Sequence, residues 1–122
     1  MKNLYHKEVF WKDSFDKEAM LLVYSVEKMS FHLLQHLNNA DEKHEYTVKG
    51  LLKALYEIKT NNNGYLFEVE EENGRVTKAV YRTKYDDRKD ICIVIRKGII
   101  VTAWINYKND NHFTLDKTKY VC

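Results

Sequence analysis

The sequence predicts an α+β fold in which N-terminal helices pack on one face of a four-stranded antiparallel sheet. Apolar residues recur at helical spacing in the first half and switch to strict alternation after the Asn61 to Gly64 run. Asn73-Gly74 and Lys97-Gly98 then join alternating segments as hairpin turns. With no proline and only four glycines there is no flexible linker, so we expect one domain over 1–122, helical over about 14–60 and sheet over about 64–122.

The first helix is expected to begin near Ser14, whose hydroxyl is a candidate N-cap, and to run to about Met29. Ser30 offers either a second cap or a kink before a further apolar segment. Another amphipathic helix should follow Thr47, because apolar residues recur at helical spacing from there to the asparagine run. The aromatic-rich arm before Ser14 is either a short helix or an irregular strap over the core.

The sheet should be a meander of four strands. In 65–71, Tyr65, Phe67 and Val69 are expected on one side and Leu66, Glu68 and Glu70 on the other. After the return strand 75–85, the hairpin 91–106 follows, in which Thr102, Trp104 and Asn106 point the same way. The tail 108–122 closes the sheet as a short edge element. With helices on one face, the other face is expected to be open to a partner.

Composition narrows the function classes. A net charge of +2 gives no strong electrostatic sign of a nucleic-acid partner, so such a claim depends on where Lys and Arg lie. Cys92 and Cys122 have neither metal-ligand nor disulfide spacing, which favours a reduced setting. No N-terminal signal and no window of about 18 apolar residues is present, so we expect a cytoplasmic protein without a membrane partner.

Among the five histidines, His112 is the candidate for chemistry. It follows closely after the strand that carries Thr102, Trp104 and Asn106. Imidazole has an ordinary pKa of about 6.5 and can exchange a proton near neutral pH, as attack by a ribose 2′-hydroxyl requires. The alternative is that His112 only fixes a turn.

Two other groups of residues are candidates for a functional site. His32 and His36 have the spacing of a metal face on a helix, but no adjacent glutamate accompanies them, so we expect no metal site. Strand alternation puts Lys78, Arg82 and Lys84 on one face with Val76 and Val80. Those cations form either an edge that approaches phosphates or an ordinary solvated face.

The C-terminal third resembles a known group of nucleases. Thr102-Ala103-Trp104-Ile105-Asn106, then Asp110-Asn111-His112-Phe113-Thr114-Leu115-Asp116 and Lys119-Tyr120, follow the pattern T-A-W-x-N…N-D-x-H-x-T-L-D…K-Y. This is similar to the end of small nuclease domains of bacterial polymorphic and contact-dependent toxins and their phage relatives. Those domains are grouped with the barnase, EndoU, colicin and RelE-like ribonucleases.

The resemblance implies a metal-independent ribonuclease that needs no cofactor. In it His112 would be the general acid or base, Thr102 a hydrogen-bond donor to the scissile phosphate, and Arg82 the stabilising charge. Trp104, Asn106 and Tyr120 would shape the nucleotide pocket. The partners would be RNA and an immunity protein or antitoxin.

A second hypothesis keeps the same face without catalysis. In that case the chain is a phage or mobile-element protein that binds a protein or a nucleic acid there. The N-terminal half, with His32, His36 and the aromatic arm, matches nothing in the nuclease pattern.

Overall fold

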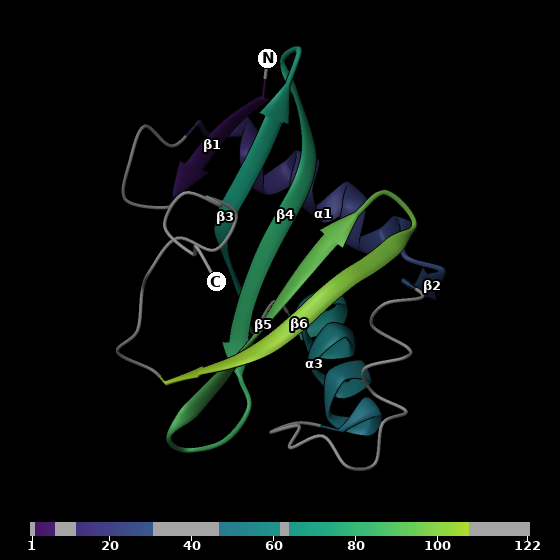
Figure 1. Ribbon diagram of the computed structural model, residues 1–122, viewed down its shortest axis with the longest axis vertical. Helices are drawn as coiled ribbons and strands as arrows, with labels where there is room; N and C mark the ends of the chain where they lie inside the picture. The colour runs from purple at the N-terminus through teal and green to yellow at the C-terminus, as the bar shows by residue number, and fades with distance from the viewer. Residues whose placement is uncertain (1, 7–11, 31–46, 62–63, 108–122) are drawn as a thin grey trace, which may run out of the picture.

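The computed structural model describes residues 2–6, 12–30, 47–61 and 64–107. Within these residues the fold is α+β, with two helices and six strands in one mostly antiparallel sheet (Figure 1). The helices are α1 (Ser14–Ser25) and α3 (Val48–Asn61). The strands are β1 (Lys2–His6), β2 (Lys28–Met29), β3 (Tyr65–Glu72), β4 (Arg75–Lys84), β5 (Lys89–Arg96) and β6 (Ile99–Tyr107), in the spatial order β1-β3-β4-β5-β6-β2.

The four central strands form the predicted antiparallel meander. Asn73 and Gly74 both have positive φ, 53° and 80°, as a two-residue type I′ hairpin loop requires. Gly98 has a φ of 81° in the turn between β5 and β6. The prediction of two glycine-dependent hairpins is therefore confirmed.

The predicted four-stranded sheet is too small, because an edge strand is added on each side. On one side, β1 pairs antiparallel with β3 and sets Leu4 opposite Glu70. Over Lys2–His6 the N-terminal arm is thus neither helix nor strap. Its residues do not alternate between apolar and polar, so this strand depends on pairing with a distant segment rather than on a local pattern.

On the other side, α1 ends at Ser25, before the predicted end at Met29. The Ser25 hydroxyl accepts a hydrogen bond from the backbone N–H of Gly98 at 2.9 Å. The backbone N–H groups of Glu27 and Lys28 both donate to the Gly98 carbonyl oxygen, at 2.9 and 3.2 Å. These contacts draw the chain out of the helix and make β2 a short parallel strand beside β6.

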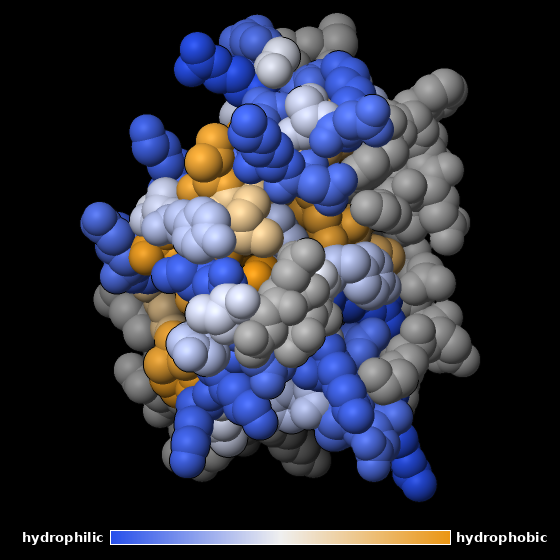
Figure 2. Space-filling model, turned by 180° about the vertical axis from the view of Figure 1, so that it is seen from behind, coloured by the Kyte–Doolittle hydropathy of each residue, from blue (hydrophilic) through white to orange (hydrophobic). Residues whose placement is uncertain are grey.

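Helices α1 and α3 cover one face of the sheet, and the main hydrophobic core lies between them and the strands (Figure 1). Burial in this core raises the pKa of the Tyr81 phenol far above its usual range, so the phenol stays neutral. From the helix side the surface is mostly hydrophilic with small apolar patches (Figure 2). The buried residues of the main hydrophobic core are Phe15, Ala19, Leu22, Val23, Leu51, Ala54, Leu55, Ile58, Leu66, Val69, Val76, Ala79, Tyr81, Ile91, Ile93, Ile95, Ile100 and Ala103.

The alternation predicted for β3 is wrong because the strand contains a bulge. Its pairing with β4 shifts between Leu66 and Glu68, which inserts Phe67 as an extra residue. Leu66 and Val69 consequently both join the core under the helices. Phe67 packs on the opposite face, in a cluster that contains Val80, the residue opposite Glu68.

Two further register shifts change which side chains face the helices. A shift in the β3–β4 pairing after Glu70 turns Val76 toward the helices, so Val76 and Val80 do not share a face as predicted. A shift in the β5–β6 pairing turns Ile100 toward the helices and Val101 away from them, whereas strict alternation counted from Thr102 would place the two residues the other way round. Simple period-two counting fails wherever one strand carries an extra residue.

A polar contact ties the N-terminal strand to the sheet. Lys12 Nζ lies 3.1 Å from Oε2 of the buried Glu71, and the Tyr5 hydroxyl donates to Oε1 of the same carboxylate at 3.5 Å. The ammonium group also lies 5.6 and 5.7 Å from the ring centres of Tyr5 and Phe15. Its hydrogen bond to Glu71 raises the pKa of Lys12. This contact joins β1, the start of α1 and β3.

Gly64, just before β3, offers a test of the packing. A Cβ added there would meet the Ile58 side chain at 2.9 Å and the Arg82 carbonyl oxygen at 3.1 Å. Gly64→Ala should therefore lower the free energy of unfolding, measured by urea denaturation, by about 1–3 kcal/mol, the usual cost of overpacking.

The control is Lys49→Ala, because Lys49 is exposed on α3, the helix that carries Ile58. We expect it to change the free energy of unfolding by less than about 0.5 kcal/mol. Equal losses in the two variants would show that the contacts at Gly64 are not the cause.

Candidate functional site

The face of the sheet opposite α1 and α3, called here the second face, carries the predicted site residues of β6. Thr102, Trp104 and Asn106 lie opposite Val94, Cys92 and Asp90 of β5. Trp104 packs against the buried cluster of this face. The predicted common direction of the three side chains is confirmed. Thr102 and Trp104 are partly exposed, whereas Asn106 is buried.

Arg82 also lies on the second face, but it is fully buried. Its Nε donates to Oδ2 of Asp90 at 2.8 Å, and its guanidinium carbon lies 5.5 Å from the centre of the Phe67 ring. The two partners are diagonal neighbours on β4 and β5, since Arg82 pairs with Cys92 and Asp90 with Lys84. The expectation of an exposed cation at this position is wrong, because the guanidinium is engaged inside the sheet.

The centre of the second face is closed to solvent, which corrects the prediction of an open face. Phe67, Val80, Cys92 and Val94 form a buried apolar cluster there, with Val101 and Trp104 packed against it. Nδ2 of Asn106 donates to Sγ of Cys92 at 3.7 Å. A partner can therefore contact the second face only at residues of that face that are exposed. These are Thr102, Trp104 and the charged residues at the ends of the strands.

Two cations lie directly opposite each other at one end of the second face. Lys78 of β4 pairs in register with Arg96 of β5, and neither makes an ion pair with a residue that the structure describes. Like charges placed this way repel and destabilise the pair. Glu70 lies opposite Lys78 on β3, where its carboxylate accepts a hydrogen bond from Thr77 at 2.9 Å. Arg96 lies two residues after Val94, which pairs with Thr102, and is therefore on the same face of the sheet.

The remaining predicted site residues, His112 and Tyr120, lie outside the described residues, as do His32 and His36. Their assigned roles stay predictions. Of the six residues assigned to catalysis and substrate binding, the structure brings Arg82, Thr102, Trp104 and Asn106 to one face.

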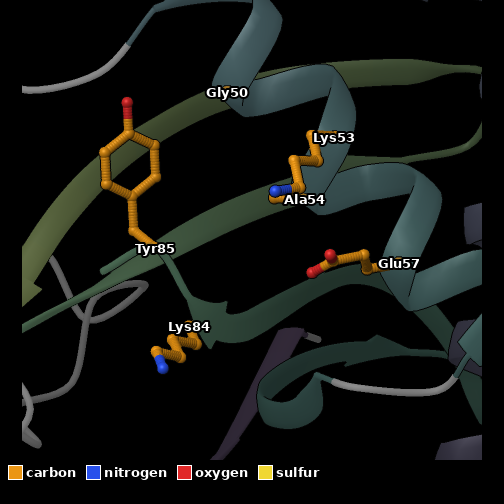
Figure 3. A pocket seen from close by; sticks show the side chains of 6 residues that line it. All are labelled: Gly50, Lys53, Ala54, Glu57, Lys84 and Tyr85. Atoms are coloured by element: carbon orange, nitrogen blue, oxygen red, sulfur yellow. The ribbon is translucent and has the colours of Figure 1, made fainter. Parts of the chain in front are cut away.

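A pocket of about 510 Å³ lies between α3 and the end of β4, and its described lining contains none of the predicted site residues (Figure 3). Thr47 caps α3, because its Oγ1 accepts a hydrogen bond from the Gly50 N–H at 3.0 Å. Helical spacing then places one set of side chains along the pocket. The described lining residues are Gly50, Lys53, Ala54, Glu57, Lys84 and Tyr85.

This pocket is not among the predicted sites, although the helix and the strand that form it, α3 and β4, are both predicted. Lys53 and Glu57 look like ordinary solvated charges on an amphipathic helix. The one unusual signal is Gly50, a helix-interior glycine that costs about 1 kcal/mol relative to alanine. Its partner Tyr85 is distant in sequence, so only the folded chain shows why the glycine is there.

In the part of the chain that the structure describes, no three His, Cys, Asp or Glu residues gather as ligands for a metal ion. Likewise, neither α1 nor α3 has the length and apolar character needed to cross a bilayer. The metal-free expectation for the whole chain remains a prediction.

The Arg82–Asp90 pair predicts a large stability effect. Arg82→Ala should lower the free energy of unfolding by about 3–5 kcal/mol, because it leaves a mostly buried carboxylate without its ion-pair partner. Lys84→Ala, at an exposed position on the same strand, should change it by less than about 0.5 kcal/mol. Urea denaturation of both variants measures the difference, and unchanged stability in Arg82→Ala would contradict a structural role for the pair.

Comparison of the chain with protein-family models, with curated proteins and with solved structures gave no match.

Proposed function

We propose that the protein is a metal-independent ribonuclease of the bacterial toxin type, which binds RNA at the exposed parts of the second face. The observation that supports this most directly is the row of Thr102, Trp104 and Asn106 on one face of β6. In sequence, that strand leads directly toward His112. The Thr102 hydroxyl and the Trp104 ring, both partly exposed, can contact a phosphate and a base of the same RNA strand, while the buried Asn106 amide is bonded to Cys92.

In this proposal, His112 exchanges the proton of the attacking 2′-hydroxyl or of the leaving oxygen, which yields a cyclic phosphate. The Thr102 hydroxyl donates a hydrogen bond to the scissile phosphate. Trp104, Asn106 and Tyr120 shape the nucleotide pocket.

The source of positive charge differs from the expectation in the sequence. Arg82 is buried against Asp90, so it serves to hold the second face together rather than to contact a phosphate. The opposed cations Lys78 and Arg96 are better placed for that role. The negatively charged RNA backbone would relieve the repulsion between Lys78 and Arg96, and this electrostatic effect would favour its binding.

A second candidate function is binding of RNA or a protein at this face without catalysis. The observation that favours it is the closed centre of the face, where Arg82 is fully buried and Cys92 and Val94 are covered. An immunity protein or antitoxin would be the protein partner of the nuclease. In the second candidate function the chain is itself a phage or mobile-element protein that holds a protein or a nucleic acid at this face.

Cleavage of total RNA and transfer RNA by the purified full chain, with and without a metal chelator, tests the proposal. We expect cleavage to persist with chelator and His112→Ala to reduce its rate by about 10²–10⁴-fold, the usual contribution of a general acid or base. Thr102→Val should also slow cleavage while preserving the β-branched shape of the strand residue. Thermal unfolding of each variant controls for loss of fold.

One outcome decides between the candidates, and variants of the opposed cations test the RNA contact that both candidates share. If wild-type protein binds RNA but leaves every RNA intact, the nuclease proposal fails and the binding candidate replaces it. Lys78→Ala and Arg96→Ala should each weaken RNA binding and reduce its dependence on salt. Lys17→Ala, an exposed change on α1, should leave both unchanged.

A further inference from the structure

We propose that the pocket between α3 and the end of β4 is a binding site for a single nucleotide. The base would lie against Tyr85 with its edge toward Glu57, and the phosphate would lie against Lys53. This site lies outside the row of β6 residues assigned to cleavage, and it does not depend on catalysis.

The pocket has a fixed aromatic wall. The Tyr85 hydroxyl accepts a hydrogen bond from the backbone N–H of Thr47 at 3.3 Å, and the Tyr85 backbone N–H donates to the Lys89 carbonyl oxygen at 3.0 Å. A Cβ on Gly50 would lie 2.8 Å from Cε1 of the ring, so only glycine lets the ring approach the helix this closely. A tyrosine held at both ends presents a ready surface for stacking of a base.

The charges around this wall suit an anion with hydrogen-bond donors. Figure 3 shows the ends of Lys53 and Glu57 pointing from α3 toward the side of the pocket that Tyr85 and Lys84 form. Within the described residues, neither Lys53 nor Glu57 makes an ion pair. Lys84 lines the pocket where β4 ends, but its ammonium group points away from Lys53 and Glu57 and pairs with Asp87 at 3.5 Å (Figure 3).

These groups match the parts of a nucleotide one by one. A phosphate accepts hydrogen bonds from ammonium groups, which contact it as point charges. A carboxylate such as that of Glu57 accepts from the N–H groups on the edge of a base. The volume of about 510 Å³ lies within the usual range of small-ligand sites, roughly 300–1,000 Å³.

Titration calorimetry of the full chain with AMP, GMP, CMP and UMP tests the site, with the corresponding nucleosides and inorganic phosphate alone as comparisons. We expect a nucleotide to bind more tightly than its nucleoside or phosphate, since stacking and charge both contribute. Lys53→Ala should weaken binding by about tenfold or more, the typical effect of losing a hydrogen bond to a charged group. Tyr85→Leu should weaken it by a similar factor through the lost stacking.

Lys49→Ala is the matched control, because Lys49 is exposed on the same helix but does not line the pocket. It should leave the affinity unchanged. Gly50→Ala should reduce the affinity by displacing the ring, and thermal unfolding of every variant separates this effect from loss of fold. If nucleotides bind no better than phosphate, or if Lys53→Ala binds them as the wild type does, the site is refuted.

Binding of short single-stranded RNA shows whether the pocket takes a free nucleotide or one nucleotide unit of an RNA strand. If RNA binds more tightly than the mononucleotide and Lys53→Ala weakens both, the pocket holds one unit of a strand. If only mononucleotides respond to Lys53→Ala, the site takes a free nucleotide. In both cases Lys78→Ala should leave mononucleotide affinity unchanged, so failure of the RNA-cleavage proposal and failure of this site are distinguishable.

Discussion

The buried ion pair between Arg82 and Asp90 constrains the whole sheet. Two charges removed from water are costly unless their geometry is good, and here a 2.8 Å contact and the Phe67 ring compensate for that cost. A slip of one residue in the register of β4 would turn the guanidinium toward the apolar core under the helices. The pair therefore holds β4 and β5 in one alignment, and with it the positions of Thr102 and Trp104 on β6.

Local patterns were enough to predict much of this fold. Apolar spacing located α1 and α3, the asparagine run before Gly64 marked the change to strands, and Asn73-Gly74 gave the correct hairpin. The shared direction of the β6 side chains also follows from a local rule, because past its register shift this strand alternates without interruption. These features depend on neighbours within a few residues.

The predictions that failed concern features that depend on contacts between different segments of the chain. Strand β2 exists because Gly98 binds the residues after α1, and the bulge at Phe67 appears only in the pairing of β3 with β4. Strand alternation could not show whether Arg82 is exposed, because it predicts the face of the sheet on which a side chain lies and not what covers that face. The pocket at Tyr85 likewise joins two segments whose residues carry no shared sequence signal.

The arrangement of the strands also bears on how the chain folds. Strands β3 to β6 are joined by short turns, so their pairing requires little loop closure. The edges are different: the Tyr5–Glu71 contact of β1 spans 66 residues, and the Ser30–Val101 contact beside β2 spans 71. Because long loops must close before such contacts form, the central meander should assemble early and both edges late. Amide hydrogens at the two edges should then exchange with solvent sooner than those of β4 and β5.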